Sequence, residues 1–244
     1  MKISVITAVF NAENSIAKCV DSVASQQNAD FEHILVDNCS TDQTVKLALE
    51  HNPRLKVISE PDQGIYDAMN KGARHAAGDI LAWLNADDFY FPGTLSEAVR
   101  IFTEHPEVQI VHGNLRVNGR EVRPPSGPAS FGGARIFHPA AFLRRELFER
   151  VGPFDPTYKL CADLDFFLKG KKAGAVFYHA DQIFTDFALG GASTKHRILT
   201  AEEVRRALLE NGCGWGRANL FYACMRLRGF AVKWFVRPVH GVQG

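Results

Sequence analysis

The amino-acid sequence predicts an α/β domain with a doubly wound, mostly parallel sheet, a smaller mixed second half and a helical C-terminal appendage. Three observations lead to this class. Short β-branched runs alternate with helically spaced apolar residues through residue 84. Near residue 110 the pattern changes to a hairpin signal and loops, and residues 199–244 look mostly helical. At 244 residues, the chain is long enough for one large domain.

The first half is expected to hold four strands separated by three helices. In the first helix, Ile16, Val20 and Val23 are spaced as one apolar face. Ser40 and Gln43 match a capping box, with Ser40 as the N-cap of the second helix and Gln43 reaching back. Strands that alternate with helices in this way indicate a parallel sheet. The expected strands are 3–9, 33–36, 55–59 and 80–84, and the expected helices are 12–26, 41–50 and 64–76.

The second half carries weaker signals. Asn118-Gly119 between Val117 and Arg120 is typical of a hairpin turn. The proline-rich stretch 124–128 predicts a loop, and one helix is expected near 163–171. The helical C-terminal region is interrupted at 212–216.

Charge and cysteine usage exclude several classes of protein. The formal net charge of +1 does not favour a nucleic-acid binder. Five cysteines without a CxxC pair argue against a secreted disulfide framework and favour a reducing compartment. Because neither a signal peptide nor a membrane-length apolar stretch is evident, we expect a cytoplasmic catalytic part. After Glu210 there is no acidic residue, whereas five cations follow: Arg217, Arg226, Arg228, Lys233 and Arg237.

Polar residues follow each strand of the predicted parallel sheet, where ligands bind in such folds. They are Asn11, Asp37, residues 60–62 and residues 85–88. Acidic side chains tolerate a phosphate only when a cation lies between them. The sequence also lacks GxxxxGK[ST], and the glycines at 212–216 follow no strand. These features favour a diphosphate held through Mg²⁺ or Mn²⁺ over a glycine-cradled nucleotide.

Eight segments resemble, in order and spacing, the family 2 glycosyltransferases with the GT-A fold. The resemblance covers roughly residues 1–195, and eight weak motifs in the same order make a strong match. The segments are Thr7–Asn11, Val36–Asp42, Asp62–Gly72, Leu84–Asp88, His138–Pro139, Val151–Asp155, Ala162–Asp165 and Phe187–Ser193.

This resemblance implies a single glycosyltransferase domain over residues 1–198. Its nucleotide-sugar-binding half would be 1–110 and its acceptor and catalytic half 111–198, followed by a basic helical appendage at 199–244. Asp37 would accept a hydrogen bond from the N3–H of uracil, although an Asp–Asn loop pair is the alternative. The implied nucleotide-sugar-binding residues are Thr7, Val9, Asn11, Asp37, Asp62, Asn85, Ala86 and Asp87.

The segment 85–88 would be this chain's version of the DxD metal motif, with Asn85 in place of the first Asp. The amide keeps an oxygen acceptor but loses a charge. Asp87, with Asp88 next to it, would hold Mn²⁺ or Mg²⁺. The alternative is that these acids only begin a turn before residues 91–93.

Asp163 matches the family's catalytic acid, where this chain has Ala162-Asp163. An inverting transfer needs one general base to take the proton of the attacking hydroxyl, and a helix N-cap is the alternative role. In a helix, Asp165 lies about 200° around from Asp163, so the two should not face one substrate atom. The implied acceptor or loop positions are His138, Asp165, Gly191 and Ser193.

The sequence thus predicts an inverting glycosyltransferase that moves a sugar from a nucleotide-diphosphate donor, a UDP-sugar, to a hydroxyl of a glycan or a lipid-linked acceptor. A sugar nucleotidyltransferase and a catalytically inactive sugar-nucleotide or glycan-binding module are the competing readings. The aromatic and basic residues 217–238 fit a helix on the anionic inner face of the membrane. Packing on the domain, or a contact between copies of the chain in an oligomer, is the alternative.

Overall fold

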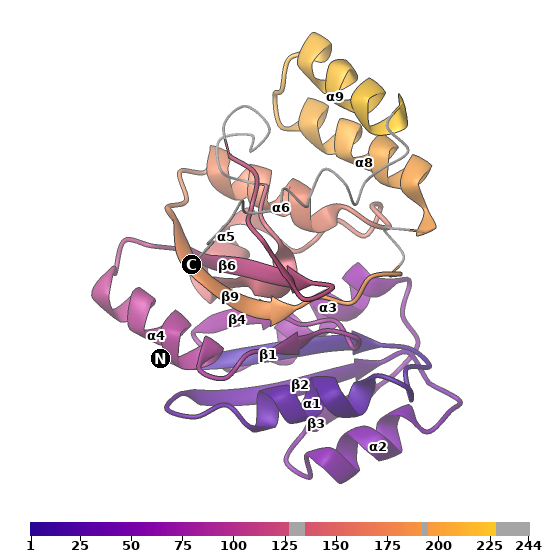
Figure 1. The fold of residues 1–244 in the computed structure, drawn as a ribbon, viewed down its shortest axis with the longest axis vertical. Coiled ribbons are helices and arrows are strands. Elements are labelled where there is room, and N and C mark those ends of the chain that lie inside the picture. The colour runs from indigo at the N-terminus through magenta and orange to yellow at the C-terminus, as the bar shows by residue number, and fades with distance from the viewer. Residues whose placement is uncertain (127–134, 192–194, 228–244) are drawn as a thin grey trace, which may run out of the picture.

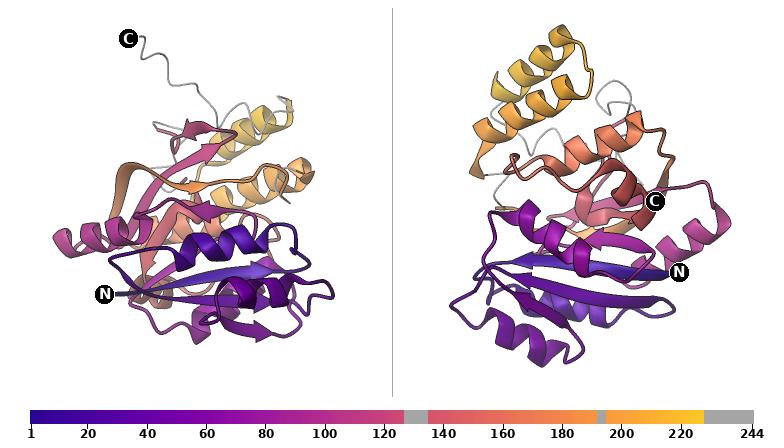
Figure 2. Two further views of the ribbon diagram at one scale, coloured as in Figure 1. Left: turned by 60° about the horizontal axis from the view of Figure 1, so that its bottom comes forward. Right: turned by 180° about the vertical axis from the view of Figure 1, so that it is seen from behind.

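We describe a computed structural model of the chain, which defines residues 1–126, 135–191 and 195–227 (Figure 1). Across these residues one sheet runs through the molecule, with the strand order β3-β2-β1-β4-β8-β6-β9-β5 and with β7 paired to β6. Helices cover both faces of this sheet, and the last two described helices lie together beyond its second half (Figures 1 and 2).

The first half confirms the predicted order of strands and helices. β1, β2, β3 and β4 pair in parallel. α3 packs on the face that carries Ile6 and Val36, whereas α1 covers the face that carries Val5. Helices on opposite faces make the sheet doubly wound. The bounds are β1 Lys2–Val9, α1 Ile16–Ala24, β2 Asp30–Asp37, α2 Thr44–His51, β3 Lys56–Ser59, α3 Ile65–His75 and β4 Ile80–Trp83.

The second half is mixed, as predicted. β8 lies antiparallel to both β4 and β6, whereas β9 lies parallel to β6. The helix α5 and the ten-residue strand β9 were not expected from the sequence. The bounds are β5 Phe89–Tyr90, α4 Thr94–Glu104, β6 Ile110–Val117, β7 Arg120–Val122, the 3-10 turn η2 His138–Ala140, β8 Ala141–Arg144, α5 Arg145–Val151, α6 Ala162–Lys172 and β9 Phe177–Asp186.

The predicted hairpin joins β6 to β7. Its central residues Asn118 and Gly119 have φ angles of 50° and 75°, as the hairpin turns with two positive φ angles require. Of the loop expected at 124–128, residues 127 and 128 lie outside the described residues.

The capping box expected at the second helix is wrong. α2 begins at Thr44, and its N-cap Gln43 makes no side-chain capping bond. The Ser40 hydroxyl instead accepts the N–H of Asn11. Asp42 takes the capping role, because its carboxylate accepts both the N–H and the hydroxyl of Thr44. Residues 38–43 therefore belong to the loop at the end of β2 rather than to the helix.

The C-terminal region forms two helices, α8 Arg197–Glu210 and α9 Trp215–Leu227, with the predicted interruption between them. They do not stand apart from the domain. Val204, Ala207, Leu208 and Ala218 belong to the same buried cluster as Phe166 of α6. Residue 198 therefore does not mark the edge of the packed core.

All five cysteines are free thiols. Among the helices of the described residues, none combines the length and the apolar character that crossing a membrane requires.

α3 lies unusually close to the sheet at Gly72. A methyl group added to Gly72 would come within 2.3 Å of Cγ2 of Ile6 and 3.2 Å of Cγ2 of Val36. Ile6 is fully buried in β1, so its side chain has little room to move. The missing side chain at residue 72 therefore sets the distance between α3 and the strand ends that face the candidate site.

We predict that Gly72→Ala destabilises the fold, by roughly 1–3 kcal/mol of overpacking, which outweighs the better helix propensity of Ala. Gly170→Ala in α6 is the matched control, because its added methyl would meet no atom closer than 3.9 Å. Urea unfolding should show a lower midpoint for the first variant and an equal or higher one for the second. Equal midpoints for Gly72→Ala and the wild type would contradict the close packing.

Candidate active site

The parallel pairing brings the carboxyl ends of four strands to one edge of the sheet. Val9 is level with Asp37, and Asp37 is level with Ser59. The N–H of Leu84 bonds to the carbonyl of Ile6, so β4 ends beside them. The candidate residues at 11, 37, 62 and 85–88 therefore share one edge, as expected for a ligand site in a parallel sheet.

Asp37 is fixed before any ligand arrives. Its side chain is buried, and the carboxylate accepts the N–H of Ser40 at 3.1 and 3.2 Å and the hydroxyl of Ser59 at 2.6 Å. A carboxylate oxygen has two lone pairs, so these bonds leave acceptor capacity for one further donor. The arrangement is a rigid acceptor at the end of β2.

The other residues expected to bind the nucleotide sugar differ in their solvent exposure. Asn11 is exposed with φ 48°, and its side-chain oxygen accepts the N–H of Thr41. Val9 is only 6% exposed. Thr7 is fully buried, and its hydroxyl lies 3.0 Å from Nε2 of His33. Asp62 accepts the N–H of Gly64 at the start of α3. Thr7 thus points into the protein, and Asn11 and Asp62 shape the edge.

The loop after β4 holds two adjacent acids in contrasting settings. Asp87 is exposed, and no hydrogen bond or ion pair joins its carboxylate to another described residue. Asp88 is buried and accepts the N–H of Ala188 at 2.9 Å and the amide of Asn85 at 2.8 Å. Burial raises the pKa of Asp88 to about 7; the bond from Ala188 opposes this rise and the charge of Asp87 adds to it.

These two acids suit a divalent cation. Burial is the main cause of the raised pKa of Asp88, and the neighbouring Asp87 adds to it; a cation bound between the two carboxylates would favour their charged forms. No group of three or more His, Cys, Asp or Glu in the described part of the chain is placed to hold a metal. The protein would therefore supply one or two carboxylates, with Asp87 the accessible one, and phosphates and water would complete the shell, as is usual for Mg²⁺.

Asp163 lies in the first turn of α6 and reaches the same site. Its carboxylate accepts the Tyr66 hydroxyl at 3.0 Å and contacts Nδ1 of His138 at 3.0 Å. The side chain is 20% exposed. Burial raises the pKa of Asp163, but His138, the N–H of Leu164 and the Tyr66 hydroxyl together lower it below its ordinary value. Asp163 is therefore an ionised carboxylate with access to solvent.

His138 connects the two groups of acids. Its Nε2 lies 3.2 Å from Oδ1 of Asn85, whose amide nitrogen faces Asp88. Each ring nitrogen of His138 therefore lies within hydrogen-bond distance of an oxygen atom, one on Asp163 and one on Asn85. A continuous chain of contacts runs from Asp163 through His138 and Asn85 to Asp88.

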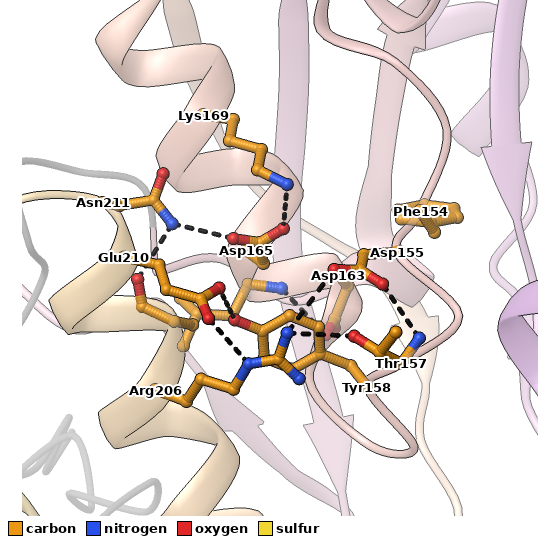
Figure 3. A network of polar contacts seen from close by, with 12 residues as sticks. Phe154, Asp155, Thr157, Tyr158, Asp163, Asp165, Lys169, Arg206, Glu210 and Asn211 are labelled. Carbon is orange, nitrogen blue, oxygen red and sulfur yellow. Dashed lines mark hydrogen bonds and ion pairs between the residues drawn. The ribbon is translucent and has the colours of Figure 1, made fainter.

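Two of the expected acceptor or loop residues do not join this chain. Asp165 is buried on the other side of α6, where it pairs with Lys169 and accepts the amide of Asn211 (Figure 3). It faces α8, which agrees with the expectation that Asp163 and Asp165 point apart. Gly191 is half-buried and its carbonyl accepts the N–H of Lys195. Ser193 lies outside the described residues.

Tyr66 is a site residue whose contact with Asp163 the sequence did not predict. Its hydroxyl bond to Asp163 joins residues 97 positions apart, which no local pattern reveals. The nearby Trp83 is buried against Phe154, with its N–H bonded to the carbonyl of Met69, so it belongs to the core.

Comparison with known proteins agrees with this geometry. Residues 4–156 match the model of the glycosyl transferase family 2. A PGL/p-HBAD biosynthesis glycosyltransferase of Mycobacterium bovis is 36% identical over 178 residues, which cover 67% of this chain and 67% of that protein.

Solved structures share the fold at lower identity. TarS of S. aureus matches with a TM-score of 0.72 and 21% identity, over 95% of this chain and 44% of that chain, so this chain spans less than half of TarS. A shorter TarS, residues 1–349, has been solved with UDP-GlcNAc. The mannosyltransferase PcManGT from Pyrobaculum calidifontis, solved with GDP-Man and Mn²⁺, matches with a TM-score of 0.71 and 20% identity over 94% of this chain and 75% of its own.

The order of motifs, the GT-A type of sheet and the sequence identity to a curated relative converge on one assignment. The chain belongs to glycosyltransferase family 2 and is an enzyme of that class.

Proposed function

We propose that this enzyme transfers a sugar, with inversion, from a nucleoside-diphosphate donor to a hydroxyl of a glycan or a lipid-linked acceptor. The observation that carries the proposal is the position of Asp163, an ionised carboxylate linked through His138 and Asn85 to Asp88, the neighbour of Asp87. Base and diphosphate site then lie on opposite sides of one bound sugar. Relatives of the same fold solved with UDP-GlcNAc and with GDP-Man support a donor of this chemical class.

Asp163 is the proposed general base. It takes the proton of the acceptor hydroxyl as that oxygen attacks the anomeric carbon, and no enzyme nucleophile is needed for a single displacement. The Tyr66 and His138 contacts hold the carboxylate in one orientation. Since they also keep its pKa low, Asp163 stays ionised at neutral pH and ready to accept a proton.

Asp87 and Asp88 are the proposed holders of Mn²⁺ or Mg²⁺, which would offset the charge that builds on the departing diphosphate. Asp88 is already anchored by Ala188 and Asn85, so Asp87 is the side chain free to turn towards a ligand. The PcManGT complex contains Mn²⁺, which supports a metal of this type in the shared fold.

The presence of Asn85 in place of an acid is compatible with an active enzyme. Its amide donates to Asp88 with one end and accepts from His138 with the other, which a third carboxylate at this position could not do. This use of both ends favours an active enzyme over an inactive sugar-nucleotide or glycan-binding module. Membership of family 2 also removes the reason for the nucleotidyltransferase reading.

The donor base is proposed to be uracil, read by Asp37, with Asn11 and Asp62 at the rim. A carboxylate accepts from the imide N3–H of uracil, and the free acceptor capacity of Asp37 supports that role.

A peripheral position on the inner face of the membrane is proposed through residues 217–238, of which 228–238 lie outside the described residues. Phe221 and Met225 of α9 pack against the core, so this face of the helix is occupied. The side chain of Leu220 is 66% exposed, and that of Trp215, which lies just before this segment, is 72% exposed. These two side chains, with Arg217 and Arg226, are the described groups that would meet an anionic surface.

We predict that UDP binds more tightly than GDP or ADP in the presence of Mn²⁺, and that EDTA weakens the binding. Calorimetry with the three nucleotides measures this directly. Asp37→Asn, which keeps the size but replaces one acceptor oxygen by a donor, should reduce the preference for UDP. Equal affinity for all three nucleotides in the wild type would rule out base reading by Asp37.

We predict that Asp87→Ala abolishes the Mn²⁺-dependent part of UDP binding and leaves the fold intact, because the side chain is exposed and makes no bond to another described residue. Asp30→Ala is the matched control, since Asp30 is equally exposed but lies at the amino end of β2, away from the site. Retained metal dependence in Asp87→Ala would move the metal ligand elsewhere, first to Asp88.

We predict that Asp163→Asn lowers turnover by roughly 10²-fold or more, the usual scale for losing a general base. UDP affinity should stay within about twofold, because the base serves the acceptor rather than the diphosphate. Release of UDP from the donor sugar, with water or an added glycan as acceptor, gives the rate. Near-normal turnover, or loss of UDP binding together with activity, would falsify the assignment of Asp163 as base.

A further inference from the structure

Three features of the described residues lie outside the proposed mechanism: a histidine cluster between β6 and β9, the exposed apolar side chains of α8 and α9, and a buried acid on α8. In the cluster around His112 and His179, Nε2 of His179 lies 2.7 Å from Oδ1 of Asn114 and Nδ1 of His112 is buried without a hydrogen-bond partner, but the described residues form no metal-holding group there. The exposed side chains Ile198 and Trp215 lie towards opposite ends of the α8–α9 pair, and nothing shows what would cover them. The buried acid, Glu203, is the feature that connects directly to the start of α6.

Glu203 binds the backbone just before α6. Its side chain is buried, 6% exposed, and its carboxylate accepts the N–H groups of Lys159, Leu160 and Cys161 at 2.7, 2.8 and 3.0 Å. Cys161 is the N-cap residue of α6 and supplies no side-chain cap of its own. The acid of α8 therefore binds the N-cap residue and the two residues before it, close to the N-terminus of α6, where the helix dipole also favours a negative charge.

Asp163 follows two residues after the last of these three amides. The direction of its side chain depends on the backbone at 159–162, because α6 begins at Ala162. The Asp163 contacts with His138 and Tyr66 need that direction. A charged hydrogen bond to each of three successive N–H groups is a strong constraint on this short segment.

The rest of α8 supports the same segment through polar contacts spaced along one side of the helix. Arg206 donates to Thr157, and Glu210 accepts the hydroxyl of Tyr158 (Figure 3). Asn211, just after the end of α8, donates to Asp165, two residues after Asp163 in α6. At the other end, the carbonyl of Thr200 faces Sγ of Cys161 at 3.7 Å. α8 thus contacts residues 157–165 along its whole length.

We propose that Glu203 is a positioning residue for the transfer reaction: its carboxylate fixes residues 159–161 so that Asp163 meets His138. This inference rests on the proposed role of Asp163 as the base. α8 would then contribute to the position of the base, although this helix lies after the region of family resemblance.

The test compares Glu203→Gln with Glu202→Gln in the full-length protein. Glu202 is the adjacent acid on the same helix, but it is exposed and binds no other described residue. Glutamine at 203 keeps the length of the side chain and replaces one of the two acceptor oxygens by a donor, which opposes the facing N–H groups. We expect turnover to fall roughly 10- to 100-fold in Glu203→Gln, as for small misplacements of a reacting group. UDP affinity should stay within about twofold, and Glu202→Gln should match the wild type.

A substrate-free measurement separates positioning from general support. The pKa of Asp163 is followed through its carboxyl carbon by NMR, with Asp163→Asn providing the assignment. The groups that face Asp163 are His138 from η2, Tyr66 from α3 and Cys161 at the start of α6. Because the His138 contact lowers the pKa of Asp163, its loss in Glu203→Gln should raise that pKa, and the acidic limb of the turnover profile should move to higher pH.

Unchanged turnover per folded molecule, or an unchanged Asp163 pKa in Glu203→Gln, would overturn the inference. If Glu203→Gln does not fold, Glu203→Asp decides, because the carboxylate is kept but withdrawn by one methylene. The expected result is then reduced turnover with UDP binding retained, and wild-type turnover overturns the proposal. A fully active Asp163→Asn would refute the base itself, whereas an inactive Asp163→Asn with an active Glu203→Gln would refute only the role of Glu203.

Discussion

The arrangement of this enzyme depends on the imidazole of His138, which lies between Asp163 and Asn85. The parallel sheet alone brings Asp37, Asp62 and residues 85–88 to one edge, but it does not bring Asp163 there. α6 packs on the second half, and Asp163 meets Asn85 through His138 of η2 and Tyr66 of α3 directly. The Asn85 amide in turn binds Asp88, so the imidazole joins side chains from both halves of the chain at one place.

The sheet and its ligand edge could be predicted because both follow from local rules. Each of the first four strands is a short buried run, and the residue types after it are visible in the sequence. The predictions that failed concern elements whose local sequence signal is misleading or weak. The capping box at Ser40 was matched by pattern, but the loop after β2 is held by Asn11, a residue from another strand end. α5 is short, and its seven residues give too little periodicity to stand out from neighbouring loops.

The candidate site shows the same division. Asp163, His138, Asn85 and Asp88 could each be named, since each falls within a family-like motif, yet the contacts that join them depend on tertiary packing over 25 to 53 positions. Thr7 has the right place in the sequence, but alternation along β1 turns its hydroxyl inwards to His33. Glu203 carries no sequence signal, because an acid in an amphipathic helix is ordinarily solvated. Its proposed positioning role follows only from the N–H groups that it binds in the folded protein.

The central claim is that one bound sugar lies between the acids at 87 and 88 and the base at 163. A crystal structure of the enzyme with a uridine-diphosphate sugar and Mn²⁺ tests this most directly. The account predicts that the diphosphate and the cation meet at Asp87, that the uracil faces Asp37, and that Asp163 approaches the anomeric carbon on the face opposite the diphosphate, with its His138 contact intact. A sugar bound beyond the reach of Asp163, or a cation held away from residues 87 and 88, would contradict it.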